Sequence, residues 1–312
     1  MKKIAFLFPG QGSQKVGMGQ DLAREFDQAR DVFAAADQVS GRPIMQYCFE
    51  GPMAELTQTV NLQPAVTAVN LAFLAAVQKA GIRPTVCAGH SLGEFSALCA
   101  AGVVTEEDCL KLVFRRGELM HREACRNKGA MSAIVGLDID QVTGLVDEAA
   151  QLGAVAVANH NSAQQIVITG SPEAVTAAGQ IASARGARAI PLKVSGAWHS
   201  PLIQGAVDEF TAFLDGIDFQ APACDLIHNV TAATESEPKQ IRALMARQLC
   251  SPVRWFDSVM AMIAQEMEVF VEIGPGRVLS GLLKKIVPKE SSVRLYNVFD
   301  LKTLERFVQA EG

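Results

Sequence analysis

The pentapeptide Gly89–Gly93 follows the pattern G-x-S-x-G, with Ser91 at its centre. This pattern is typical of a sharp strand-to-helix turn that exposes a nucleophilic serine. The apolar run 86–88 before it indicates a buried strand, and the Ala- and Leu-rich run 92–101 indicates a helix that ends at Gly102. We therefore interpret Ser91 as a nucleophile at a helix N-terminus, where free N–H groups and the helix dipole favour a developing negative charge.

A serine nucleophile needs a general base, and the sequence has five histidines. His199 lies in a loop, and loops at strand ends carry catalytic groups in α/β proteins. Its place after Ser91 in the chain also suits the order of the α/β hydrolases. His90 is adjacent to Ser91, which disfavours a hydrogen bond between the two side chains. The other histidines are predicted to be structural: His121, His160 and His228.

No carboxylate stands out as a third catalytic group beside His199. A main-chain or amide carbonyl could orient the imidazole as well as a carboxylate could. The sequence leaves this choice open. The carboxylate candidates are Asp208, Asp215 and Asp257.

The glycine-rich loop 9–14 follows a predicted strand at residues 3–8. It fits neither common nucleotide pattern, because Lys15 and Met18 stand where glycine and lysine would be required. We expect the loop to bring backbone N–H groups to the strand ends instead. The N–H of Leu92 is then one oxyanion donor, and the second comes from the loop around Gln11.

Arg116 is predicted at the edge of the apolar stripe of a helix at 105–125, whereas Arg115 falls on the opposite, solvated side. An arginine half-buried between apolar residues needs an anionic partner. Two partners remain possible, an internal Glu or Asp and a substrate carboxylate received by the guanidinium fork. No metal site is expected, since C-x-x-C and H-E-x-x-H motifs are absent from the sequence.

The composition favours a globular enzyme, with 49% hydrophobic and 20% charged residues in 312. The net charge of -5 gives no electrostatic reason to bind nucleic acid. No uninterrupted apolar stretch is long enough to span a membrane, and the run after Lys3 is too short for a signal peptide. Seven scattered cysteines are best explained as reduced thiols. We expect a cytoplasmic protein with no nucleic-acid or membrane partner.

The alternation of strand and helix patterns predicts an α/β fold with a mostly parallel sheet covered on both faces. Between residues 129 and 195 the pattern becomes β-α-β-β-α-β, which matches a ferredoxin-like unit. We predict a large domain of residues 1–128 and 196–312, with residues 129–195 as an inserted small subdomain. The large domain is expected to have helices near 20–40, 62–80, 105–125, 202–215, 238–250 and 255–265, and a last buried strand at 269–273.

Seven motifs occur in the order seen in malonyl-CoA:acyl carrier protein transacylases, and this resemblance covers nearly the whole chain. It implies an acyltransferase of fatty acid synthesis with an α/β-hydrolase-like large domain and a ferredoxin-like small subdomain. The implied partners are malonyl-CoA and acyl carrier protein, with no cofactor beyond the CoA thioester substrate, and a monomer is expected. The motifs lie at 8–14, 89–94, 116–117, 161–162, 198–200, 248–249 and 272–276.

The resemblance also implies residue roles. Ser91 would be the acylated nucleophile and His199 its general base and acid, held by the main-chain carbonyl of Gln248. Arg116 would clamp the malonyl carboxylate. The oxyanion donors would be the N–H groups of Gln11 and Leu92, and further substrate-binding residues would be Gln11, Asn161, His90 and Met120.

Two positions depart from the family pattern. Trp198 stands where many members have phenylalanine, which predicts a bulkier pocket wall beside His199. His160 stands where a phenylalanine or tyrosine is usual. Neither position belongs to the implied catalytic set.

Three other functions stay open at this stage. The first is a serine thioesterase or carboxylesterase on the same scaffold, which would have to admit water to the acyl-enzyme. The second is a carrier-docking component without catalysis, and the third is a polyketide transacylase acting in trans.

Overall fold

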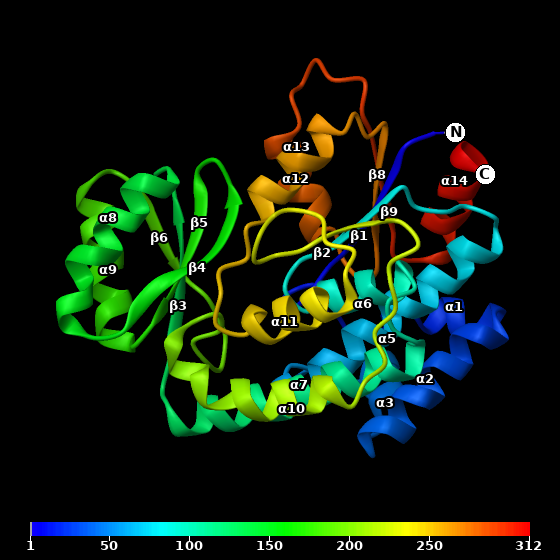
Figure 1. Cartoon of the computed structure of the whole chain (residues 1–312), viewed down its shortest axis with the longest axis horizontal. Helices are drawn as coiled ribbons and strands as arrows, with labels where there is room; N and C mark the ends of the chain where they lie inside the picture. Colours follow the sequence, from blue (N-terminus) through cyan, green and yellow to red (C-terminus); the bar gives the residue numbers. More distant parts are fainter. Residues whose placement is uncertain (1) are drawn as a thin grey trace.

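The large sheet contains five strands in the order β7-β2-β1-β8-β9, and every neighbouring pair is parallel. The structure, a computed structural model, describes residues 2–312 (Figure 1). Continuous apolar runs form the central strands because both of their faces are covered. The predicted α/β fold with a mostly parallel sheet is therefore confirmed. The strands are β1 (Ile4–Phe8), β2 (Val86–Gly89), β7 (Asp225–Ile227), β8 (Val269–Ile273) and β9 (Arg294–Val298).

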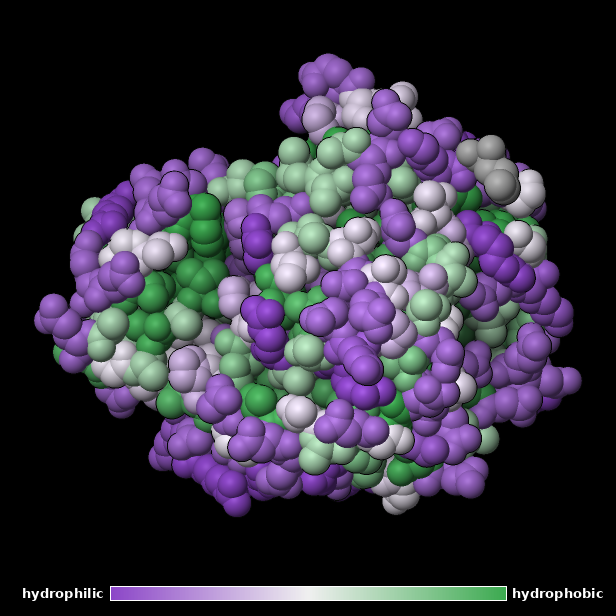
Figure 2. Space-filling view, in the orientation of Figure 1, coloured by the Kyte–Doolittle hydropathy of each residue, from purple (hydrophilic) through white to green (hydrophobic). Residues whose placement is uncertain are grey.

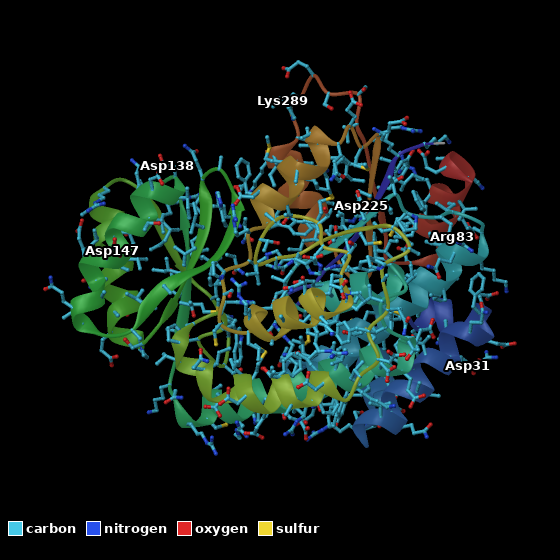
Figure 3. All side chains as sticks on the ribbon, viewed as in Figure 1. Asp31, Arg83, Asp138, Asp147, Asp225 and Lys289 are labelled. Carbon is cyan, nitrogen blue, oxygen red and sulfur yellow. The ribbon has the colours of Figure 1, made fainter. Side chains whose placement is uncertain are left out.

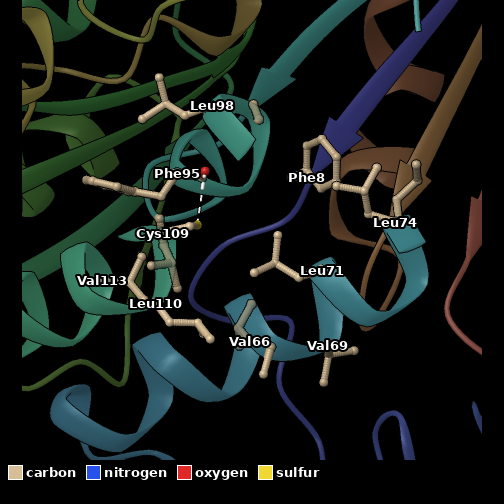
Figure 4. Close-up of a cluster of buried hydrophobic side chains, with 14 of the residues drawn as sticks. Phe8, Val66, Val69, Leu71, Leu74, Phe95, Leu98, Cys109, Leu110 and Val113 are labelled. Carbon is tan, nitrogen blue, oxygen red and sulfur yellow. Dashed lines mark hydrogen bonds between the residues drawn. The ribbon is translucent and has the colours of Figure 1, made fainter. Parts of the chain in front are cut away.

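Successive residues of each central strand enter two different cores. Phe6 and Phe8 point into the larger core, and Ala5 and Leu7 into the smaller one. Helix α5 (Thr59–Lys79) runs through the larger core, and α12 (Trp255–Ala264) and α13 (Val278–Ile286) cover the other face. Figure 4 shows part of the larger core, with Phe8, the α5 side chains Val66, Val69, Leu71 and Leu74, and Phe95, Leu110 and Val113.

A separate antiparallel sheet has the strand order β4-β5-β3-β6. Helices α8 and α9 pack on its outer face, at the left of Figure 1, around a third apolar core. Figure 2 shows hydrophobic side chains over these strands on an otherwise largely hydrophilic surface. The elements are β3 (Ala130–Val135), α8 (Ile139–Ala149), β4 (Val155–Ser162), β5 (Gln165–Gly170), α9 (Pro172–Ala184) and β6 (Arg188–Pro191).

Main-chain hydrogen bonds join the small sheet to the rest of the molecule. The N–H of Val253 donates to the carbonyl of Ala158 at 2.8 Å, and the N–H of His160 donates to the carbonyl of Val253 at 2.9 Å. Strand β4 is thereby fixed at the end that carries Asn159 and Asn161.

Several predicted boundaries need correction. The strand at 269–273 is not the last, because β9 follows it at the sheet edge. The predicted helix at 20–40 is two helices separated at Phe26, whose extended backbone interrupts the helical hydrogen bonds. The predicted helix at 202–215 begins with a 3-10 segment, Pro201–Ala206, before α10. The remaining helices are α1 (Gln20–Glu25), α2 (Asp27–Ser40), α3 (Ile44–Phe49), α4 (Met53–Leu56), α6 (Gly93–Ala100), α7 (Glu106–Arg126), a 3-10 turn (Ala150–Leu152), α10 (Val207–Asp215), α11 (Pro238–Gln248) and α14 (Leu301–Glu311).

Helix α5 is long and apolar enough to cross a membrane by length and composition. In this fold 94% of its most apolar window is buried inside the protein. Its hydropathy is therefore explained by its central place in the larger core.

The turn between β2 and α6 is packed too closely for any side chain at its two glycines. A Cβ on Gly89 would overlap the main chain of Gly93, and a Cβ on Gly93 would overlap the carbonyl oxygen of Phe8 in β1. The G-x-S-x-G spacing thus follows from the contact of three main-chain segments. Gly102 also has a positive φ of 76°, but a Cβ added there would meet no atom within 4 Å.

We predict that Gly93→Ala lowers the free energy of unfolding by about 3 kcal/mol or more, because the added methyl group must displace main chain. The control Gly102→Ala meets only the left-handed backbone penalty, about 1 kcal/mol. Urea unfolding midpoints of the two variants measure the difference. Equal losses would contradict the close packing at the turn.

Candidate active site

Ser91 occupies the tip of the turn with a left-handed backbone, φ 51°. The side chain of Asn229 holds this conformation. Its Oδ1 accepts from the Ser91 N–H at 2.7 Å, and its Nδ2 donates to the carbonyl of Gly89 at 2.6 Å. A strained nucleophile position is thus supported by the segment after β7.

The Ser91 hydroxyl lies 2.7 Å from Nε2 of His199, although the two residues are 108 positions apart. The Nδ1–H of His199 faces two main-chain carbonyls, those of Gln248 and Ser251, each at 3.0 Å. These acceptors place the ring proton on Nδ1, which leaves the Nε2 lone pair for the Ser91 proton. Of the two groups that the sequence left open for orienting His199, main-chain carbonyls are therefore the ones present.

None of the three candidate aspartates is bonded to His199. Asp257 pairs with Arg254, and Asp215 lies 3.8 Å from Arg242. Asp208 lies in the first turn of α10. His228, predicted to be structural, is wholly buried and bonded to Glu94.

Burial, and after it the nearby positive charge of Arg116, lower the pKa of His199 to about 3. Both effects disfavour the imidazolium form. The ring is therefore neutral at physiological pH, the state in which it can accept a proton from Ser91.

Arg116 is wholly buried, with 1% of its surface exposed, rather than half-buried as predicted. The helical-wheel prediction considered only its own helix, whereas α5 packs against α7 at this point. Its Nη1 donates to Gln63 Oε1 at 3.0 Å, and its Nη2 donates to the Ser91 hydroxyl at 3.2 Å. Within residues 2–312 it forms no ion pair, so the alternative of an internal salt bridge is wrong. Its Nε has no acceptor among these residues.

A buried carboxylate balances this charge without touching it. Glu94 Oε2 accepts from Gln248 Nε2 at 2.7 Å, and Gln248 Oε1 accepts from Arg116 Nη2 at 3.2 Å. Burial lowers the pKa of Arg116 to about 10, and the charge of Glu94 opposes this shift. The amide of Gln248 therefore separates the cation from its nearest buried anion.

Sequence reasoning missed four residues that organise the site. Glu94 also accepts from His228 Nδ1 at 2.8 Å and from the N–H of Asn229 at 3.3 Å. Glu94 lies directly after the G-x-S-x-G motif, and this position could have indicated that it belongs to the site. His228 and Asn229 follow a strand of only three residues that no pattern revealed, and Gln63 lies within an apolar helix.

The glycine-rich loop reaches the turn as predicted. A Cβ on Gly10 would lie 2.5 Å from the carbonyl oxygen of His90 and 3.4 Å from the nitrogen of Leu92. Gln11 and Leu92 both line the cavity beside Ser91. Neither main-chain N–H donates a hydrogen bond to another part of residues 2–312, so both are available to an oxyanion.

The cavity at Ser91 has a volume of about 100 Å³. Eight of its lining residues were discussed in the sequence analysis, and four more come from the small sheet and the irregular segment after β6. The first group is Gln11, His90, Ser91, Leu92, Arg116, Met120, Trp198 and His199, and the second is Met131, Asn159, Leu192 and Val194.

Asn161 is not among the lining residues. Its Oδ1 accepts from Nε2 of His90 at 2.8 Å, so it positions His90 from the small sheet. Trp198 lines the cavity and is 5% exposed, so its indole forms part of the wall beside His199. His160 instead contacts the ring of Phe256 on α12, with ring centres 5.0 Å apart. Within residues 2–312, no group of three or more His, Cys, Asp or Glu is placed to hold a metal ion.

Residues 5–299 match the family model described as an acyl transferase domain. The chain belongs to the acyl transferase family. This acyl transferase is 41% identical to the malonyl CoA-acyl carrier protein transacylase of Bacillus subtilis, with 99% of this chain and 97% of the relative covered.

Two solved structures are also similar. An acyl carrier protein S-malonyltransferase from Vibrio cholerae is 41% identical with a TM-score of 0.93, covering 98% of this chain and 100% of its own. A malonyl-transacylase in complex with its type II PKS acyl-carrier protein is 39% identical with a TM-score of 0.95. The match covers 99% of this chain and 100% of that chain. The family resemblance expected from the sequence motifs is confirmed.

We predict that Arg116→Ala raises the pH at which the reaction rate of Ser91 falls on acidification, the acid limb of its pH profile. Removal of the cation raises the pKa of His199, so on acidification the base is protonated, and lost, earlier than in the unmodified enzyme. The rate of Ser91 phosphonylation by a neutral fluorophosphonate, followed from neutral to acid pH, measures this limb. Arg115→Ala is the matched control, and an unshifted limb in Arg116→Ala would refute the electrostatic coupling.

Proposed function

We propose that this acyl transferase moves a malonyl group from malonyl-CoA to the phosphopantetheine thiol of acyl carrier protein. One observation carries the substrate assignment. A buried guanidinium donates to the hydroxyl of Ser91, has an unpartnered Nε and pairs with no carboxylate of residues 2–312. A malonyl unit on Ser91 would bring a carboxylate to this cation.

The first half-reaction forms the acyl-enzyme. Ser91 Oγ attacks the thioester carbonyl while His199 Nε2 takes its proton, and the N–H groups of Gln11 and Leu92 receive the oxyanion. The C–S bond then breaks, and His199 returns the proton to the leaving CoA thiolate. The product is a malonyl-serine ester.

The second half-reaction runs the same steps in reverse, with the carrier thiol in place of the CoA thiol. The carrier thiol gives its proton to His199 and attacks the ester carbonyl, and the Ser91 oxygen leaves with that proton. A second cavity of about 650 Å³ shares Gln11, Leu192 and Val194 with the catalytic cavity. Its size and position support a path for the pantetheine arm of both thioesters.

The finer architecture is part of this proposal. The strand order β4-β5-β3-β6 supports a ferredoxin-like subdomain at 129–195, and the parallel sheet supports a hydrolase-like domain at 1–128 and 196–312. We further propose a cytoplasmic monomer that needs no cofactor beyond its CoA thioester and has no nucleic-acid or membrane partner.

The rival hydrolase is less consistent with the site. A thioesterase gains nothing from an arginine held next to the acylated oxygen, and it must deliver water to the ester. The rival polyketide transacylase would use the same chemistry with another carrier, and the complex described above is a type II PKS pair. Transfer rates to the two classes of carrier protein distinguish these possibilities.

We predict that incubation with malonyl-CoA adds the mass of one malonyl group to the intact protein and that acyl carrier protein removes it. Ser91→Ala should show no added mass, because the attacking oxygen is missing. Intact-protein mass spectrometry measures both steps. Labelling of Ser91→Ala would reassign the nucleophile, and rapid loss of the ester in buffer alone would favour a hydrolase.

We predict that Arg116→Ala lowers kcat/KM for malonyl-CoA by about a hundredfold or more, because a buried charge pair of ~3 kcal/mol or more is lost. Transfer from acetyl-CoA should survive or rise, since acetyl leaves the arginine without its partner. Arg116→Lys serves as a second variant if the alanine variant folds poorly, and Arg115→Ala controls for surface charge. An unchanged malonyl-to-acetyl ratio would refute the clamp.

A further inference from the structure

Two cysteines meet between the neighbouring parallel strands β2 and β7. Cys87 lies in β2 opposite Leu226 of β7, and Cys224 precedes β7 by one residue. Their sulfur atoms are 3.7 Å apart. Both strands lead directly into the active site, β2 to Ser91 and β7 to Asn229, which holds the Ser91 N–H.

The two thiols differ in their access to solvent. Cys87 is wholly buried in the larger core. Cys224 is partly exposed and lines an open surface cavity of about 410 Å³, formed by residues 222–226 and 234–236. Its exposed neighbour Asp225 is labelled in Figure 3. A small oxidant can therefore reach Cys224 but not Cys87.

The contact between the two sulfur atoms also gives the two cysteines different chemical roles. The hydrogen bond from Cys87 lowers the pKa of Cys224, while burial raises the pKa of Cys87 well above its usual value. Cys224 is thus favoured as the thiolate, and Cys87 as the thiol that donates to it. The thiolate is the form that reacts with peroxides.

We propose that Cys224 is a peroxide-reactive thiol and that Cys87 is its resolving partner, so that a hydroperoxide closes a disulfide between β2 and the segment before β7. The Cys224 thiolate attacks one peroxide oxygen, the O–O bond breaks, and sulfenic acid and hydroxide form. The Cys87 sulfur then attacks the sulfenic sulfur, its proton and the sulfenic OH leave as water, and the S–S bond forms. The peroxide is reduced by the two electrons that the thiol pair loses.

The fold permits this closure at its edge. A disulfide requires the sulfur atoms to approach to about 2 Å. Strand β7 has three residues and lies at the edge of the sheet, whereas β2 is paired on both sides. Formation of the disulfide therefore requires the segment before β7, rather than the strand that carries Ser91, to move. Closure would also protect Cys224 from irreversible oxidation to sulfinic acid, since the sulfenic acid is consumed by its neighbour.

The test treats the full-length, reduced protein with hydrogen peroxide and follows intact mass and digested peptides. We expect the loss of two hydrogen atoms, one peptide pair linked through Cys87 and Cys224, and full reversal by dithiothreitol. Cys125 is exposed and has no thiol partner among the described residues, so Cys125→Ser is the matched control and should form the same bridge.

Two further variants separate the roles. In Cys87→Ala, which avoids a buried hydroxyl, Cys224 should gain one oxygen and then more, with no loss of hydrogen. In Cys224→Ser, Cys87 should stay reduced. A linkage through Cys99 or Cys125, or reduced Cys87 and Cys224 while other cysteines are oxidised, would overturn the proposal. These readouts do not depend on malonyl transfer, so failure here is distinct from failure of the proposed function.

Discussion

The site depends on keeping one cation charged inside the protein without pairing it directly with an anion. A buried guanidinium that touched a carboxylate would already be neutralised, and a substrate carboxylate would have to displace that partner. Here the amide of Gln248 stands between Arg116 and Glu94. Glu94 still supports the charged state through space, while the guanidinium keeps hydrogen-bonding capacity toward Ser91. This arrangement favours a ligand that brings its own negative charge.

The same requirement explains why a carbonyl, rather than an aspartate, orients His199. A carboxylate at Nδ1 would raise the pKa of the imidazole and place a negative charge near Arg116. The carbonyls of Gln248 and Ser251 fix the ring tautomer without adding charge. Gln248 therefore serves both halves of the site, since its carbonyl holds the base and its side chain holds the arginine.

The sequence predicted those parts of the site that depend on local pattern. G-x-S-x-G indicated the strand, the turn and the helix, because the close contact of backbones requires glycine at fixed spacing. The partners of Ser91 beyond this turn depend on tertiary packing. Asn229 contacts Ser91 from 138 positions away and follows a strand of only three residues. Arg116 is buried because α5 packs against α7, and the periodicity of α7 alone does not reveal that contact.

The small sheet completes the pocket, which explains why the two sheets must be fixed to each other. Met131 and Asn159 line the cavity from this sheet, and Arg116 lines it from α7. The hydrogen bond from His90 to Asn161 and the main-chain pairing at Val253 hold that wall against the nucleophile turn. Under the proposed function, Arg116 selects the acyl group by charge and the small sheet limits its size. A rotation between the two sheets would therefore change the accepted chain length before it changed the preference for a carboxylate.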